Sequence, residues 1–132
     1  MTYKVESTFV EKGLSLFNLG KETLKVDVSK ARNEDYPGPA ELLLTALSSC
    51  ILKNIERYSE ILKFQYENAR ILIEADRRDS PPKFVEIRYR VLIETSEDPH
   101  RIELLHKNIK KFGTVYNSLS EETNIVGTIE KA

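Results

Sequence analysis

Residues Gly38 to Cys50 read GPAELLLTALSSC and open the longest helical pattern in the chain, which continues to about Leu62. Proline at residue 39 suits the first turn of a helix, where its missing N–H costs nothing. The leucines, alanines and isoleucines that follow recur on nearly every side of the helix. A helix of this kind is covered on several faces. We therefore expect a long buried central helix over residues 39–62.

The residues before this helix alternate between apolar and polar side chains, which is the pattern of half-buried strands. Three short strands are expected between residues 3 and 28, separated by turns at Gly13 and Gly20. A polar loop over residues 29–38 then leads into the helix. Because loops commonly carry functional side chains, we treat this loop as a candidate part of a site.

The residues after the helix return to alternation over 69–94, with a turn at residues 79–82 that contains two prolines. This pattern predicts an antiparallel hairpin. The stretch Glu97-Asp98-Pro99 is expected to start a second helix, which Gly113 stops. A short helical turn and a final strand over 124–129 follow.

This order of elements predicts an α+β fold with antiparallel sheets around the central helix. No linker or repeat interrupts the chain, so residues 1–132 are expected to form a single domain. About six strands supply too few layers to wrap the central helix completely. We therefore expect a second copy of the chain to complete its burial, which makes the protein a homodimer.

The charge balance and the cysteine count narrow the functional class. Twenty Lys and Arg residues stand against 21 Asp and Glu residues, a formal net charge of -1, so we expect no dedicated nucleic-acid partner and no anionic-membrane partner. No apolar stretch is long enough to span a bilayer. The single cysteine excludes an intrachain disulfide and suits a reducing compartment. A cytoplasmic location is expected.

Cys50 is the one candidate nucleophile with a distinctive setting, on the central helix. A free cysteine often packs as a small apolar residue, and that structural role is the simpler interpretation. A reactive role requires the thiolate, which a nearby cation stabilises. Arg32, in the polar loop before the helix, is the best-placed candidate for that cation.

Glu41 lies in the first turn of the central helix, where a carboxylate favourably meets the free amides and the helix dipole. It precedes Cys50 by nine residues, which corresponds to opposite helix faces and about 13 Å along the axis. An unbroken helix therefore cannot pair the two within one subunit. His100 and His106 are six residues apart without metal-ligand spacing, so they are expected on the surface, and neither a metal nor an organic cofactor is expected.

The segment from Gly38 to Cys50 resembles the helix signature of the OsmC/Ohr superfamily, and the order of elements resembles that family over essentially the whole chain. The resemblance implies an intertwined homodimer with the central helices in its middle and thiol sites near the subunit interface. Characterised members reduce organic hydroperoxides: a cysteine at the position of Cys50 attacks the O–O bond, becomes a sulfenic acid and is captured by a second cysteine.

Two residues depart from the peroxidase pattern. Gly113 stands where the family carries its second cysteine, so the resemblance implies an external thiol as reductant. Ala40 stands where peroxidase members carry their catalytic glutamate, and Glu41 matches only the common motif position. The candidate site residues are therefore Cys50, Arg32 and Glu41.

Two functions follow from this pattern. The first is a one-cysteine organic hydroperoxide reductase with Cys50 as nucleophile, Arg32 as stabiliser of the thiolate and of the peroxide, and an external thiol as reductant. The second is a non-catalytic dimer that binds a small hydrophobic ligand in an interface cavity, with Cys50 as a packing residue.

Overall fold

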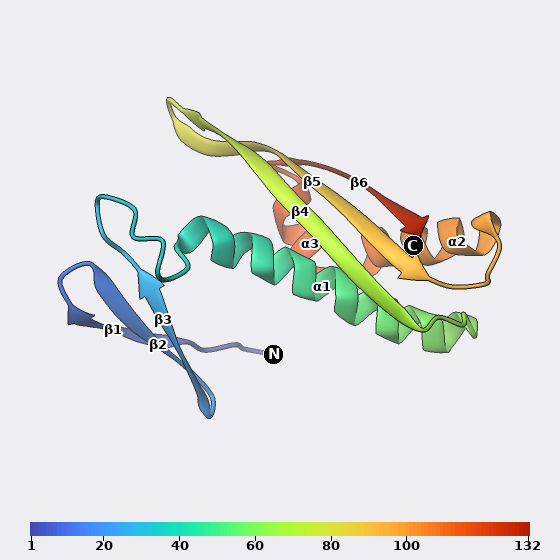
Figure 1. Ribbon diagram of the computed structural model, residues 1–132, viewed down its shortest axis with the longest axis horizontal. Helices are drawn as coiled ribbons and strands as arrows, with labels where there is room; N and C mark the ends of the chain where they lie inside the picture. Colours follow the sequence, from blue (N-terminus) through green and yellow to red (C-terminus); the bar gives the residue numbers. More distant parts are fainter. The chain divides into compact units, whose positions relative to one another are not determined.

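The structure, a computed structural model, describes residues 1–132 in two compact units, residues 1–43 and 44–132 (Figure 1). The elements in chain order are β1 (Glu6–Glu11), β2 (Leu14–Leu19), β3 (Glu22–Asp27), α1 (Pro39–Leu62), β4 (Asn68–Asp79), β5 (Pro82–Glu94), α2 (Pro99–Phe112), α3 (Thr114–Ser120) and β6 (Asn124–Lys131). The predicted α+β architecture is confirmed. α1 begins in the first unit and continues through the second.

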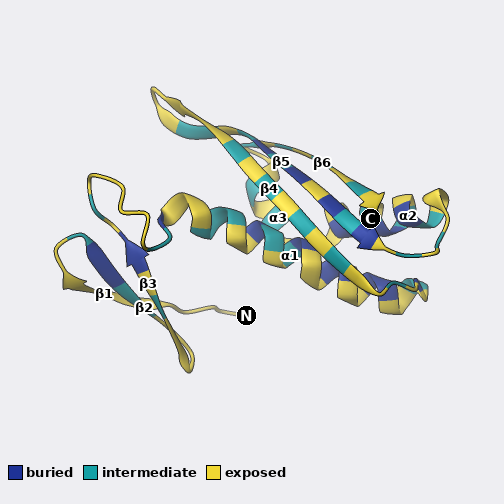
Figure 2. Ribbon diagram, in the orientation of Figure 1, coloured by how far each residue is buried: buried dark blue, intermediate teal, exposed yellow.

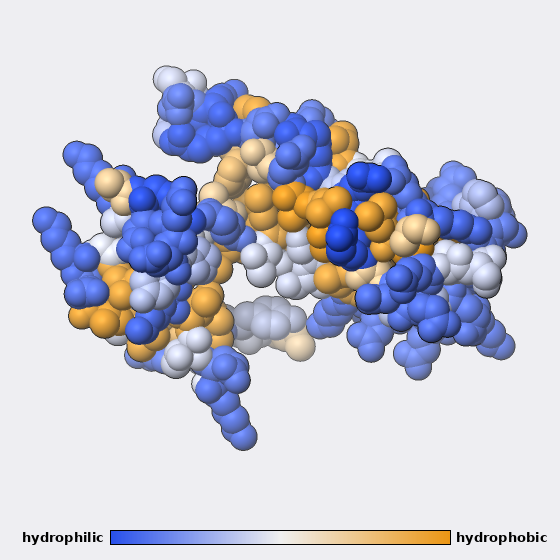
Figure 3. All heavy atoms as spheres, viewed as in Figure 1, coloured by the Kyte–Doolittle hydropathy of each residue, from blue (hydrophilic) through white to orange (hydrophobic).

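The first unit is an antiparallel sheet in the order β1-β2-β3. Gly13 connects β1 to β2 with φ +83°, a left-handed conformation that favours glycine. Leu14 and Val26 are its buried apolar side chains, whereas Phe9 is 73% exposed. Hydrophobic atoms accordingly reach the surface of this unit in the space-filling view (Figure 3). The sheet therefore carries an apolar surface that its own residues do not cover.

The sheet of the second unit has the order β4-β5-β6. β4 and β5 form the predicted antiparallel hairpin, from the Asn68–Glu94 pair to the Asp79–Pro82 pair. β6, however, pairs with β5 in parallel, beginning where Glu86 lies beside Asn124. The expectation of purely antiparallel sheets is corrected here, because α2 and α3 return the chain to the end of the sheet where β5 begins. Parallel neighbours require such a crossover, and the alternation within a strand does not encode its direction.

The core of the second unit lies on one face of this sheet. Along β5 the side chains of Ile87, Tyr89, Val91 and Ile93 are buried, and the intervening residues include the charged Arg88 and Arg90. Figure 2 shows this alternation along β5 and a weaker one along β4. On β4 the positions of the predicted inward face, Ala69, Ile71, Ile73 and Ala75, are only half-buried. The opposite face of the sheet carries ion pairs, such as the one between Arg88 and Asp76.

α1 has the bounds that the sequence predicts, Pro39–Leu62. Its buried side chains form a single stripe that includes Leu47, Ile51, Ile55 and Tyr58. Other apolar residues of α1 remain exposed, among them Leu52 and Ile61. One chain therefore buries one face of the helix, and burial on the remaining faces would require another subunit. Neither α1 nor any other helix has the length and hydropathy needed to cross a bilayer.

α2 begins and ends at its predicted signals. The Asp98 side chain accepts a hydrogen bond from the backbone N–H of Arg101, and Pro99 occupies the first turn. At the other end, the N–H of Gly113 donates to the carbonyl of Ile109. The turn between α2 and α3 lies next to α1, where Gly113 approaches Cys50.

Candidate functional site

Cys50 projects from α1 into the junction between α2 and α3. The thiol residue is half-buried. A Cβ atom built on Gly113 would lie 3.1 Å from Cys50 Sγ, and Asn54 Nδ2 lies 3.7 Å from the same sulfur. The stacked rings of Tyr58 and Phe112, with centroids 5.3 Å apart, hold α1 against the end of α2 beside this junction. The second unit thus positions the sulfur through contacts between two helices.

The space around residue 113, and not its backbone conformation, favours glycine at this position. Its φ of −75° and ψ of 116° are open to any residue. An added Cβ would lie 3.0 Å from Tyr116 Cβ and 3.1 Å from the Ile109 carbonyl oxygen, in addition to its contact with the sulfur. A non-bonded side chain at residue 113 would therefore require small shifts of these neighbours.

Arg32 lies in the loop between β3 and α1 and is held by four groups. Its Nη1 is 3.0 Å from Asp27 Oδ2 and donates to the carbonyl oxygens of Asn33, at 3.1 Å, and of Tyr36, at 2.9 Å. Its Nη2 forms an ion pair with Glu41. The guanidinium is thus oriented by contacts on both of its terminal nitrogens, and side-chain exposure of 43% leaves part of it accessible.

Asp27 anchors this loop, although it is not among the residues predicted from the sequence. Asp27 is only 4% exposed. Its carboxylate accepts hydrogen bonds from the backbone N–H groups of Ser29, at 3.0 Å, and of Asn33, at 2.9 Å. Hydrogen bonds from the Ser29 hydroxyl and these amides, together with Arg32, hold the pKa of Asp27 well below its ordinary value. The available signal was an aspartate two residues before a serine at the end of a strand, which is typical of a local turn.

The structure brings two of the three predicted site residues together. Glu41 was explained from the sequence by the helix dipole, and it also forms an ion pair with Arg32. A cavity of about 400 Å³ in the first unit is lined by both side chains, together with Asp27 and Gly38. Cys50 belongs to the second unit. Its role together with Arg32 and Glu41 stays a prediction.

A second polar contact, between Tyr89 and His106, lies inside the second unit. The sequence predicted both histidines on the surface, but His106 is half-buried. The Tyr89 hydroxyl is 2.5 Å from His106 Nε2, and the Tyr89 residue is only 3% exposed. Burial lowers the pKa of His106 to about 4, with the positive charge of Lys110 as a smaller cause. Burial also raises the pKa of Tyr89 above its ordinary value. Both groups are therefore neutral at physiological pH, and the tautomer of the imidazole determines which of them donates the hydrogen bond.

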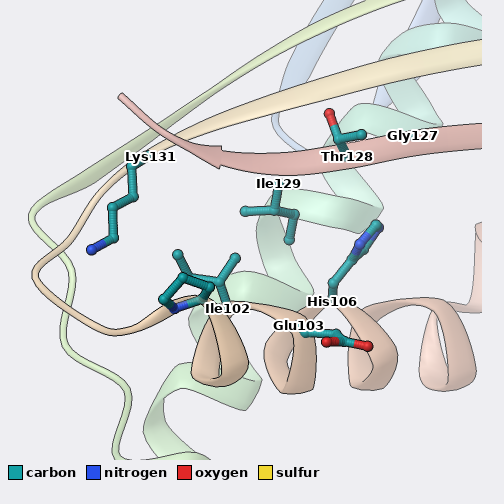
Figure 4. Close-up of a pocket in the computed structure, with 8 residues that line it drawn as sticks. Ile102, Glu103, His106, Gly127, Thr128, Ile129 and Lys131 are labelled. Carbon is teal, nitrogen blue, oxygen red and sulfur yellow. The ribbon is translucent and has the colours of Figure 1, made fainter.

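Gly127 of β6 makes room for this contact. A Cβ on Gly127 would lie 2.3 Å from the nearest atom of the Tyr89 ring, so the ring occupies the space over the glycine. A cavity of about 360 Å³ lies between α2 and β6, and Figure 4 shows His106 pointing toward β6 from α2, with Glu103 on the preceding turn. The sequence signal was a lone glycine within a strand, which often marks a close approach. No three metal-ligating side chains gather in the chain.

Comparisons with known proteins agree with this architecture. The structure is similar to an OsmC-like protein from Mycoplasma pneumoniae, with a TM-score of 0.90 and 16% identity over 100% of this chain and 98% of that one. It is also similar to an organic hydroperoxide resistance protein OsmC from Legionella pneumophila, with a TM-score of 0.77 and 15% identity over 98% and 97% of the two chains. The organic hydroperoxide resistance protein OhrB of Bacillus subtilis matches with a TM-score of 0.73 and 10% identity over 97% and 98%.

At these identities the likeness shows the fold. A comparison with curated proteins found no match. The model of the family described as OsmC-like protein matches residues 32–127, which is more than half of the chain and includes both Arg32 and Cys50. The resemblance inferred from the helix motif is therefore confirmed, and the chain belongs to the OsmC-like protein family.

Proposed function

We propose that the protein is a one-cysteine organic hydroperoxide reductase whose nucleophile is Cys50. The observation that carries the proposal is the placement of the half-buried sulfur beside residue 113, with a side-chain amide as its hydrogen-bond donor. Membership of a family whose solved relatives include organic hydroperoxide resistance proteins adds support.

The proposed reaction begins with the thiolate of Cys50. The sulfur attacks the terminal oxygen of a hydroperoxide ROOH, an S–O bond forms and the O–O bond breaks. The bonding pair leaves with RO⁻, which takes a proton and departs as the alcohol ROH. Cys50 is oxidised to the sulfenic acid and the peroxide is reduced, the chemistry expected of an accessible thiolate.

Arg32 is proposed to stabilise the thiolate and the leaving oxygen. The contacts of its guanidinium with Asp27 and Glu41 support this role, because a donor that is already oriented loses little free energy by reorganising during the reaction. In this proposal Glu41 takes the orienting function that the family pattern assigns to the position of Ala40. The ion pair between Arg32 and Glu41 supports this orienting role for Glu41.

An external thiol completes the proposed cycle, because Cys50 is the only cysteine in the chain. The sulfenic acid and a thiol R′SH give a mixed disulfide and water. A second thiol then attacks the R′ sulfur of that disulfide, releases R′SSR′ and returns Cys50 to the thiol. A reducing compartment supplies such thiols, and we accordingly propose a cytoplasmic location.

The proposed assembly is a homodimer in which a second subunit covers the exposed apolar residues. Phe9, Val10 and Leu19 of the first unit support this, since all three are exposed at 43% or more. The faces of α1 that remain uncovered support it as well.

Trapping the oxidised cysteine tests the enzymatic proposal. Reduced full-length protein is mixed with an alkyl hydroperoxide in the presence of a sulfenic-acid-specific dione, and the adduct is located by mass spectrometry. We expect one adduct, on Cys50, and peroxide turnover when a dithiol is supplied. Cys50→Ser is the matched control and forms no adduct. A wild-type Cys50 that stays reduced under excess hydroperoxide contradicts the proposal.

The second candidate function is a non-catalytic dimer that binds a small hydrophobic ligand. Gly113 and Ala40, which replace two reactive positions of the peroxidase pattern, favour it. In that case Cys50→Ala leaves the dimer and its ligand affinity unchanged, and native mass spectrometry detects a bound apolar molecule. Loss of all hydroperoxide turnover in Cys50→Ala would favour the reductase over the ligand-binding protein.

A further inference from the structure

We propose that Asn54 is a positioning residue that favours the ionised form of the Cys50 sulfur by donating a hydrogen bond to it, an inference that rests on the proposed hydroperoxide chemistry. Asn54 follows Cys50 by one helical turn on α1, so both side chains lie on the same side of the helix. Its Nδ2 lies 3.7 Å from Sγ, and the residue is 8% exposed.

Asn54 is an unfavourable choice for packing alone. It lies within the 24-residue α1, in the buried stripe beside Ile51 and Ile55. Asparagine is a weak helix former in such positions, and a buried amide loses free energy unless it is hydrogen-bonded. The contact with Cys50 is the only hydrogen bond that the Asn54 side chain makes. The buried amide is therefore matched to the sulfur and to no other group.

An amide N–H distinguishes the two forms of the sulfur. Hydrogen bonds to an anionic acceptor are about twice as strong as those to a neutral one. The thiolate accepts from Asn54 as an anion, whereas the thiol is a weak neutral acceptor. The large radius of sulfur accounts for a separation beyond the range typical of N–H···O bonds. The Asn54 amide thus lowers the free energy of the thiolate relative to the thiol.

Within the second unit, the Cys50 sulfur makes no hydrogen bond other than the one that Asn54 donates to it. Tyr116 of α3 lies beside Gly113, and burial raises its pKa, so it is neutral at physiological pH. The lysines of the neighbouring helix segments, Lys53 on α1 and Lys110 and Lys111 on α2, are exposed.

The pH dependence of alkylation tests the role of Asn54. The rate at which iodoacetamide modifies Cys50 in the folded full-length protein is measured by mass spectrometry from pH 5 to pH 10. The plateau rate at high pH reports access, and the pH of half-maximal rate reports ionisation. For Asn54→Leu we expect about a tenfold slower reaction at neutral pH, with an unchanged plateau rate at high pH. Asn54→Ala, which avoids overpacking, is expected to give the same direction if the leucine variant does not fold.

Ser59→Ala is the matched control. Ser59 is a buried polar residue of the same stripe, 6% exposed, and its hydroxyl bonds to the Glu56 carbonyl instead of the sulfur. The control is expected to keep the wild-type pH profile. Folded Asn54 variants that also keep that profile overturn the inference. Because alkylation requires no peroxide, that result is distinct from a wild-type protein that fails to form a sulfenic acid.

Discussion

The sulfur of Cys50 lies 3.1 Å from the place where a side chain at Gly113 would begin. In a disulfide, the sulfur of one cysteine lies about 3 Å from the Cβ of the other, because the S–S bond is about 2.05 Å long. Residue 113 thus occupies the place of a bonding partner for Cys50, although it is a glycine. The place of a second thiol is therefore open at residue 113, although the chain has a single cysteine.

Gly113→Cys is expected to create an intramolecular disulfide with Cys50 on treatment with a hydroperoxide. The sulfenic acid would form first and the new thiol would displace water from it. Mass spectrometry without reductant should show the loss of two hydrogens and no thiol open to alkylation. Gly113→Ser, which adds a similar volume without a thiol, is the control. Two free thiols after oxidation would contradict the geometry, and loss of the disulfide in Cys50→Ser would confirm the pairing.

Gly127→Ala is expected to destabilise the protein by about 1–3 kcal/mol, because the new Cβ overlaps the Tyr89 ring and forces it to move. The displacement would also disturb the hydrogen bond to His106. The free energy of unfolding in urea measures the effect. Thr128→Ala, at the next and exposed position of β6, is the control and should stay within about 0.5 kcal/mol of the wild type. Equal stabilities of the two variants would show that the ring has room to move.

His106 is expected to make the folded state less stable as the pH falls. Its pKa is lowered from 6.5 to about 4 on folding, so between these values the unfolded chain binds the proton more readily. The contribution is fully present above pH 6.5 and is lost progressively toward pH 4. The limiting slope is about 1.4 kcal/mol per pH unit. Urea unfolding of His106→Gln from pH 4 to pH 7 should show a flatter dependence than the wild type, and an identical slope would contradict the assignment.

Arg32→Lys is expected to lower hydroperoxide turnover about 100-fold while the protein stays folded. Lysine keeps the charge but cannot reproduce the fork that contacts Asp27 and Glu41 together. Steady-state kcat/KM with an alkyl hydroperoxide and a dithiol measures the loss. Arg77→Lys alters an exposed arginine paired with Asp79 in the β4–β5 hairpin and is the control. Equal activity of the two variants would remove Arg32 from the proposed mechanism.

Phe9→Glu is expected to weaken the proposed homodimer. The substitution places a charge in the apolar surface of the first unit, where the phenylalanine is 73% exposed. Sedimentation equilibrium should show a dimer for the wild type and a larger monomer fraction for the variant. Lys12→Glu, outside the apolar residues of that sheet, is the control. A monomeric wild type would contradict the assembly.

Local signals account for the elements that the sequence predicts correctly. Pro39 and the apolar run after it define α1, and Asp98, Pro99 and Gly113 define both ends of α2. Alternation and the turn prolines define the β4–β5 hairpin. These features depend on backbone preferences and on neighbours within a few residues. The family motif around Cys50 is likewise contained in one continuous stretch, so it too could be recognised from the sequence.

The features that depended on the tertiary structure join residues far apart in the chain. The parallel direction of β6, the contact of Gly113 with Cys50 and the hydrogen bond between Tyr89 and His106 are of this kind. Periodicity states which side of an element is apolar, but it does not state which distant group that side will meet. Hydrogen bonds and close packing act over a few ångströms in space, and only the folded chain brings such partners within that range.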